Sequence, residues 1–414
     1  MNPNAWRATL AATALMALAM GNRSAFGLFI SPLNSSTGIG LATISLAAAL
    51  GQLALGFAQP AVAALAERHG AAHVMAAGAL LLAGATALLA QVHEAGALLA
   101  LMLLASLGAS AMASNAMLMG EVGRRVPAER QGFASGLVGA GGSAGQLLLA
   151  PATQLLILAC GWRAAMWGTA ALMLLALPLL RVFASPAPRH AAAQPAAALS
   201  QALRDARLWL VAGAFAACGF HVAFLSTHMP GVFERCGLSP TLVGAALALI
   251  GAANIAGSVA VGLLMRRHSS PLLLALLYGT RAVVIALMLL VEPTAPVMIA
   301  FAALMGLTYI APLAPTAQLL AQYFGVQRLG TLFGVVMVAH QIGGFAGAWL
   351  GGVAVEHSGS YQPLWLADIA LALLGAALQW PLRENKPTAG ARAARPAAPA
   401  GPPACAAPRA ARGA

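Results

Sequence analysis

Apolar segments, each long enough for a helix that crosses a lipid bilayer, recur along the whole of this 414-residue chain. Backbone polar groups find no water in the bilayer core, so each segment is expected to fold as a helix. Only 8% of the residues are charged, whereas soluble domains carry about 25%. We therefore predict an all-α membrane protein with twelve transmembrane helices, six on either side of a polar interval, at residues 8–31, 41–65, 73–92, 97–119, 132–158, 162–183, 208–230, 241–265, 271–291, 295–320, 329–355 and 361–382.

The loops between these segments predict the orientation of the chain. Of the 22 Lys and Arg residues, 18 fall on the side that holds both termini, two fall on the other side and two lie within helices. Cytoplasmic loops of membrane proteins carry such an excess. We expect both termini in the cytoplasm, with six-helix bundles at 1–183 and 207–384, a cytoplasmic linker at 184–206 and a disordered tail at 385–414.

The two predicted bundles repeat each other at a constant spacing of 198 residues. The offset relates residues from the first helix of each bundle to the last, including the pairs Gly21 and Gly219, Gly145 and Gly343, Gly161 and Gly359, and Trp167 and Trp365. Two bundles of the same orientation imply a pseudo-twofold axis along the membrane normal. Transporters of this build bind substrate between their halves, near the middle of the membrane.

Arg23 is the one charged residue in the first predicted span. A charge at membrane depth is unfavourable by about 3 kcal/mol on insertion scales, and arginine cannot escape by losing its proton. Its planar guanidinium can bind a carboxylate through two hydrogen bonds. We predict that Arg23 binds an anionic substrate. The alternative is a structural arginine that donates to helix carbonyls or a buried acid, and we see no acid near the middle of any predicted span.

Two histidines in predicted spans are candidates for proton coupling and for substrate binding. Histidine titrates near neutral pH and can carry a proton through a transport cycle. His221 is equivalent to Arg23 in the repeat, so we expect both to flank one central cavity, and His340 lies in the eleventh span. Packing roles remain the alternative for both. His228 is expected near the outer mouth.

Uncharged polar residues within the spans add further candidates for substrate binding. Such groups can bind a substrate, and they also join helices by hydrogen bonds, so both roles stay open. The residues concerned are Asn115, Gln146, Asn254, Tyr309 and Gln341.

The layout and several motifs resemble the major facilitator superfamily. Its loop motif is G-x-L-x-D-R-x-G-R-K. The segment AALAERHGAA at 63–72 matches this motif at Leu65, Arg68 and Gly70, and has Glu67 where the motif has aspartate. Four longer stretches are similar to the bacterial monocarboxylate-transporter-like branch, the neighbourhood of the oxalate/formate antiporters: RSAFGLFISPL, GEVGRRVPAERQGFASGLVGAGGSAGQ, CGFHVAFLSTHMP and FGVQRLGTLFGVVMVAHQIGGFAGAWLGG. The resemblance implies transport of a small organic anion, often with a proton.

The resemblance also suggests roles for charges outside the cavity. Glu67, Arg68, Arg124 and Arg130 would form a gating charge cluster at the cytoplasmic rim. Arg281, in the ninth span, and Asp368, in the twelfth, would lie on peripheral helices, so we expect Arg281 to pack against its own half through carbonyls or a polar neighbour and Asp368 to be an interfacial or packing acid.

We therefore expect a multi-pass protein of a bacterial inner membrane that transports a small organic anion, a monocarboxylate, by alternating access. Symport with protons is the favoured mechanism. Efflux of apolar or cationic compounds by proton antiport, and a non-transporting sensor on the same fold, are the alternatives. No nucleophile and base, metal ligands or cofactor motif appears, so an enzyme, a metal site and a cofactor are not expected. The basic residues lie in loops and tail rather than in a patch, so we expect no nucleic acid and no obligate protein partner.

Overall fold

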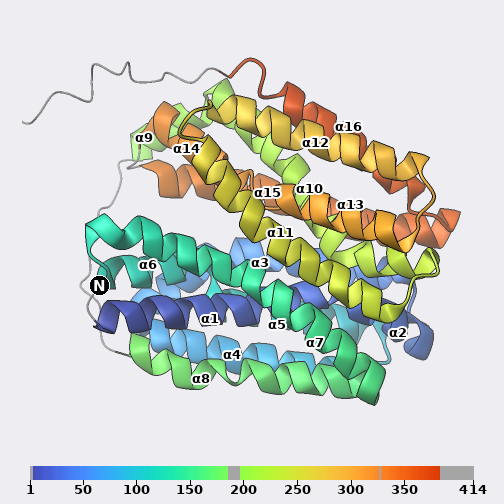
Figure 1. Cartoon of the computed structure of the whole chain (residues 1–414). Coiled ribbons are helices and arrows are strands. Elements are labelled where there is room, and N and C mark those ends of the chain that lie inside the picture. The colour runs from blue at the N-terminus through green and yellow to red at the C-terminus, as the bar shows by residue number, and fades with distance from the viewer. Residues whose placement is uncertain (1–2, 185–195, 326–327, 383–414) are drawn as a thin grey trace, which may run out of the picture.

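A computed structural model of the chain describes residues 3–184, 196–325 and 328–382, and these residues form helices joined by short turns. Figure 1 shows two helical bundles side by side. The first contains α1 (Pro3–Ala25), α2 (Gly27–Thr37), α3 (Leu41–His69), α4 (Ala71–Leu89), α5 (Ala95–Ala113), α6 (Asn115–Arg125), α7 (Gln131–Met173) and α8 (Ala176–Leu179). The second contains α10 (Ala206–Arg235), α11 (Pro240–Leu264), α12 (Ser270–Leu290), α13 (Ala295–Thr308), α14 (Leu313–Phe324), α15 (Leu329–Ser358) and α16 (Gln362–Ala377).

The described helices account for the twelve predicted spans. Among the described residues, nine helical segments, some of them made of two successive helices, are long and apolar enough to cross a membrane, and α1 and α2, bent by 43°, form a tenth span together. One of the nine, Gln131–Phe183, contains two crossings because Gly161 breaks it with a φ of 83°. The shorter apolar helix α16 is the last span. The predicted all-α, twelve-helix fold is therefore confirmed.

The polar interval between the bundles is partly helical. The short helix α9 (Ala196–Leu203) lies within the predicted linker 184–206. Residues 185–195 of that linker and the whole predicted tail 385–414 lie outside the described residues. The N-terminus, α6, α9 and α14 lie at one end of the molecule, which we call the near end (left in Figure 1), and the end of α2 lies at the opposite, far end.

The internal repeat appears in how helices approach one another. A Cβ atom on Gly145 would overlap the carbonyl of Ala17, so α7 packs on α1 through bare backbone. The equivalent Gly343 brings α15 onto α10 in the same way, against the carbonyl of Ala216. Gly161 and its equivalent Gly359 both adopt a positive φ, which glycine allows without strain. The spacing of 198 residues therefore marks equivalent helix interfaces in three dimensions.

The most extensive contacts between the bundles are made by two helix pairs: α3 packs along α15, and α7 packs along α11. At the far end the contact is close, since the backbone N–H of Ala42 donates to the Glu356 carboxylate at 2.8 Å. Toward the near end the same helices part. On α7, Gly136 and Gly139 are exposed whereas Ser143 on the same face is buried. The molecule is therefore closed at the far end and open at the near end.

Candidate functional site

A cavity lies in the middle of the first bundle, where it meets the second. Its walls come mainly from α1, α3, α4 and α5, and Ala223, Ser226 and Thr227 of α10 with Ala348 of α15 close it from the other half. Arg23 is the one charged residue among those that line it. The remaining wall is apolar except for hydroxyl and amide groups, namely Asn22, Gln52, Thr86, Ser106, Thr169, Ser226 and Thr227.

Arg23 reaches this cavity because the first span breaks just after it. The residue stands in the last turn of α1, and the chain bends before α2 begins at Gly27. A cation in the last turn of a helix is stabilised by the partial negative charge of the free carbonyls there. The side chain is half-buried, and its guanidinium donates a hydrogen bond to the Oε1 atom of Gln52 on α3. Arg23 thus faces the cavity and is bound by a neutral group.

The Gln52 amide extends this contact into the second bundle. Its Nε2 atom donates to Oε1 of Gln341 on α15 at 2.6 Å, and both amides are buried. Gln341 was predicted from the sequence as a substrate-binding residue, whereas Gln52 was not. An amide in the second span at the depth of Arg23 was the signal that could have found it.

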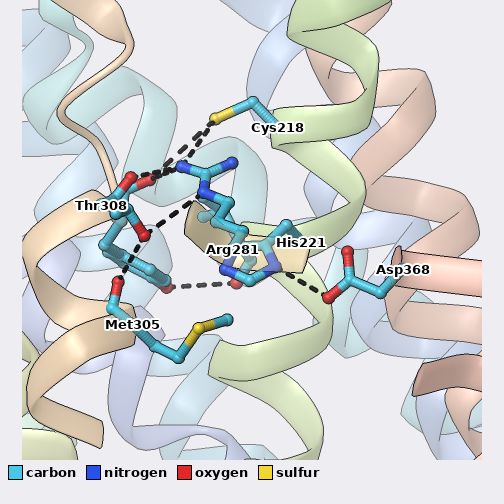
Figure 2. A network of polar contacts seen from close by, with 8 residues as sticks. Cys218, His221, Arg281, Met305, Thr308 and Asp368 are labelled. Atoms are coloured by element: carbon cyan, nitrogen blue, oxygen red, sulfur yellow. Dashed lines mark hydrogen bonds and ion pairs between the residues drawn. The ribbon is translucent and has the colours of Figure 1, made fainter. Parts of the chain in front are cut away.

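His221 does not lie where the repeat predicted. Its side chain is 1% exposed, and its Nδ1 atom lies 2.7 Å from the carboxylate of Asp368 on α16 (Figure 2). His221 is absent from the residues that line the cavity described above. The repeat relates backbone positions, but α16 supplies an acid that has no equivalent in the first bundle, and the histidine turns toward it. Asp368 was expected in the twelfth span as an interfacial or packing acid, and it is buried inside α16.

Arg281 is buried within its own bundle, as expected for a structural cation. Its guanidinium donates to the carbonyl of Thr308 and to that of Tyr309 at 2.9 Å, and lies 5.3 Å from the centre of the Tyr278 ring. These carbonyls are left free where the tenth span breaks between α13 and α14. Figure 2 shows Arg281 filling that break, with the Cys218 thiol beside it.

Asn254 and Tyr309 serve the same break rather than the cavity. Asn254 accepts from the backbone N–H of Ile310 at 2.9 Å and donates to the Ser143 hydroxyl at 2.6 Å, across the two bundles. The Tyr309 hydroxyl donates to the Val222 carbonyl at 3.1 Å. Neither residue lines the cavity. Irregular backbone at membrane depth needs such partners because water is not available.

The remaining candidates are more scattered. His340 is half-buried, its ring lies 4.8 Å from that of Phe215, and its Nδ1 atom has no hydrogen-bond partner among the described residues. Gln146 is buried with its Nε2 atom likewise unpaired there. Asn115 is exposed at the start of α6. His228 lies toward the far end, where its Nε2 atom bonds to the Ala348 carbonyl at 2.7 Å.

The predicted gating charges lie in the last turns of α3 and α6 and in the turn that precedes α7. Glu67, Arg68 and Arg130 are exposed there. Arg124 forms an ion pair with Glu121 on its own helix α6, and Arg125 pairs with the same carboxylate. Glu121 is 5% exposed and was not singled out from the sequence. The gating role of the cluster stays a prediction.

Two repeated six-helix bundles with a cavity at their junction define a membrane transporter of the alternating-access kind. The chain belongs to the Major Facilitator Superfamily, whose family model matches residues 12–294. This membership supports secondary transport of a small molecule across a membrane. A comparison of the sequence with curated proteins found no match.

Among solved structures, the chain is similar to a bacterial homolog of the human lysosomal transporter Spinster. One structure of that protein is inward-facing and unoccupied; it is 14% identical, with a TM-score of 0.68, and the match covers 92% of this chain and 95% of the other. A second, inward-facing and occupied, has the same identity and TM-score and is covered over 94%. At this identity the likeness concerns the fold.

Proposed function

We propose that the protein transports a small monocarboxylate, and the observation that carries this proposal is the electrostatic state of Arg23. The guanidinium lines the cavity, and among the described residues no acid pairs with it. Its partner Gln52 is neutral. A fixed positive charge at membrane depth favours a ligand that neutralises it, and a carboxylate fits the guanidinium in both charge and shape.

The rest of the cavity wall supports a substrate with one negative charge and an apolar body. Phe26, Phe29, Leu55 and Met102 line the cavity, and Arg23 is its sole cation. A second carboxylate on the substrate would be desolvated in the cavity with no cation there to compensate its charge, which is unfavourable. Cavity hydroxyls such as Thr86 and Ser106 can accept or donate to a polar substituent on the substrate.

Proton coupling is the second part of the proposal. His340 adjoins Gln341 and has a free ring nitrogen among the described contacts. A proton on His340, or on the substrate itself, would enter with the anion. His221 acts in this scheme only indirectly, as a titratable pair with Asp368 that joins α10 to α16. Substrate that neutralises Arg23 lowers the cost of closing the cavity to water, so the two bundles can rock.

We further propose that the near end faces the cytoplasm of a bacterial cell and that the protein lies in its inner membrane. The excess of Lys and Arg on the side of both termini supports this orientation. In that orientation the present conformation is open to the cytoplasm, and Glu67, Arg68, Arg124 and Arg130 surround its mouth.

A ligand screen on the purified protein tests the proposal. Benzoate, butyrate, succinate and an organic cation such as tetraphenylphosphonium would be compared by their effect on the melting temperature. A ligand at a hundred times its Kd stabilises the folded state by about 2.7 kcal/mol. We expect benzoate or butyrate to raise the melting temperature, and Arg23→Gln to abolish this rise.

The matched control is Arg7→Gln, because Arg7 is an exposed arginine on the same helix α1. It should leave the response intact. Stabilisation by the cation alone would instead favour the efflux of cationic compounds. Stabilisation by carboxylates without flux in proteoliposomes would favour a sensor.

A further inference from the structure

A chain of three side chains runs from the cavity of the first bundle into the second bundle. Arg23 on α1 donates to Oε1 of Gln52 on α3, and Nε2 of Gln52 donates to Oε1 of Gln341 on α15. Gln52 and Gln341 are 5% and 4% exposed, so the hydrogen bond between these two amides is buried. The cation that faces the substrate cavity is therefore bonded, through one amide, to the opposite half of the molecule.

Glycines on both helices make room for this bridge. A Cβ atom on Gly56 of α3 would overlap the side chain of Gln341. A Cβ atom on Gly344 of α15 would lie 3.0 Å from Nε2 of Gln52. Each amide thus lies across a glycine of the opposite helix, and the bridge depends on the close packing of α3 on α15.

The bridge stands at the level where the two bundles part. On α15, Gly330 and Gly334 are exposed, whereas Gln341 and Ala348, further along the helix, are buried. Between α7 and α11 the change from exposed to buried residues occurs at Ser143. This residue is equivalent to Gln341 in the repeat, and its hydroxyl accepts a hydrogen bond from Asn254. The Arg23–Gln52–Gln341 chain is therefore among the last inter-bundle contacts before the opening at the near end.

The Gln52–Gln341 bridge and the Ser143–Asn254 bridge differ in one respect. Asn254 is also fixed by the backbone N–H of Ile310, and neither it nor Ser143 lines the cavity. Gln52 both lines the cavity and accepts from its cation. Of these two bridges, the one between α3 and α15 can respond directly to a ligand that binds at Arg23.

We propose that Gln52 is a positioning residue that couples anion binding at Arg23 to movement of the two bundles. This inference rests on the proposed function. A carboxylate is a stronger acceptor for guanidinium than an amide oxygen, so an arriving anion displaces Oε1 of Gln52. The amide then loses the cation that polarises it, and its donated bond to Gln341 weakens. The contact between α3 and α15 loosens when substrate is present.

Thermodynamic linkage predicts the direction in which loss of the bridge changes the affinity for the anion. If the bridge competes with the anion, removing the bridge must strengthen binding, since a coupling between two events is reciprocal. We expect Gln52→Leu and Gln341→Leu each to lower the Kd for the bound carboxylate by about fivefold, the worth of one hydrogen bond of ordinary strength. Gln379→Leu is the control, because Gln379 is a buried amide that donates to Gly375 within its own bundle.

The movement itself can be followed with spin labels at the far end. Labels at Ser36→Cys and His357→Cys, both exposed positions on opposite bundles, report whether that end opens. In the protein used for labelling, serine replaces the cysteines that could also react with the label. These are Cys160 and Cys236, which are not fully buried, and Cys405, which lies outside the described residues. Benzoate and butyrate are the probes.

We expect a short distance in the ligand-free protein and a shift to longer distances with the carboxylate. Gln52→Leu and Gln341→Leu should show the longer distances without ligand. Unchanged affinity and unchanged distances in both variants would overturn the proposal, even if Arg23→Gln abolishes binding and so leaves the proposed function intact. If neither carboxylate binds the unaltered protein, both the proposed function and the coupling of anion binding to bundle movement are wrong. Longer label distances in the two variants would then show only that the bridge holds the bundles together.

Discussion

At the scale of single residues, the two intramembrane arginines show how different surroundings give one side chain different tasks. Arg281 is 1% exposed and donates through Nη2 to the free carbonyls of Thr308 and Tyr309, while its buried Nη1 atom has no hydrogen-bond partner among the described residues. Arg23 is half-buried beside a cavity and donates to an amide. A charge that protein groups leave uncompensated at this depth is the one expected to bind an ion.

The pair of His221 and Asp368 is predicted to stabilise the second bundle. Both side chains are 1% exposed and lie 2.7 Å apart, so replacing either leaves a buried polar partner unsatisfied. We expect His221→Ala and Asp368→Ala each to lower the free energy of unfolding by about 3 kcal/mol. The double variant should lose about 1–3 kcal/mol less than the sum, because the two changes remove one shared interaction. Denaturation in detergent measures all three; strictly additive losses would contradict the pairing.

The sequence predicted the cation of the candidate site but not its neighbours. Arg23 could be found because a permanent charge within an apolar segment requires a reason of its own. The orientation of His221 could not, since it depends on α16, a helix whose position relative to α10 is set by tertiary packing. Gln52 was missed because one amide in a long apolar helix is a common feature, and its bond to Gln341 joins residues 289 positions apart.

At the scale of helices, broken spans and glycine contacts shape the molecule. The break between α13 and α14 is stabilised by Arg281 and Asn254 from two other helices. The sequence predicted a continuous span at 295–320 because the apolar run is unbroken there. Freed backbone groups find side chain partners only in the assembled bundle, so a break of this kind is not visible in the hydropathy of the segment.

Close helix packing at Gly145 and Gly343 should be indispensable for folding. An added methyl group at either position would meet a backbone carbonyl of the neighbouring helix, which cannot move aside as a side chain can. We expect Gly145→Ala and Gly343→Ala each to destabilise the protein by about 3 kcal/mol. Gly84→Ala is the control, because nothing lies within 4 Å of the added atom there. Melting temperatures in detergent would refute the account if all three variants behaved alike.

Asp205 should stabilise the start of α10 outside the membrane. Its carboxylate accepts from the backbone N–H of Arg207 at 2.9 Å and pairs with the guanidinium of the same residue at 2.7 Å. The side-chain hydrogen bond from Arg207 holds the pKa of Asp205 below its usual value. The stabilisation is therefore present at neutral pH and is lost as the pH falls through this lowered pKa.

Replacing this N-cap tests the assignment. We expect Asp205→Ala to cost about 1 kcal/mol at pH 7, and Asp205→Asn, which can still cap the helix, to cost less. The difference between the unaltered protein and Asp205→Ala should shrink in strongly acidic solution. Thermal unfolding at pH 7 and at low pH measures it, and a difference that grows on acidification would contradict the sign.

At the scale of the whole molecule, the sequence predicted the number of spans, the two bundles and the repeat that relates them. Twelve apolar runs, and a spacing of 198 residues that survives from the first helix to the sixth, were sufficient because bilayer thickness and backbone hydrogen bonding leave few alternatives. The conformational state could not be predicted. It depends on which of two packings of the same faces is more stable, and those packings differ by only a few kcal/mol.

The exposed glycines at the near end are predicted to become a contact surface in the opposite state. Gly334 has nothing within 4 Å of an added Cβ atom and lies on the face of α15 that is buried further along at Gln341. Gly334→Leu should leave the melting temperature unchanged but obstruct closure of the near end, lowering carboxylate flux by about tenfold for a steric cost of one to two kcal/mol. Flux equal to that of the unaltered protein would show that this face stays open throughout the cycle.

Carboxylate flux into proteoliposomes, compared between the unaltered protein and variants of Arg23, tests the central claim most directly. We expect the unaltered protein to accumulate benzoate or butyrate. Arg23→Lys keeps the charge without the planar fork and should lose about tenfold or more of this flux, and Arg23→Gln should show no carboxylate flux. Flux in Arg23→Gln as fast as in the unaltered protein would contradict it.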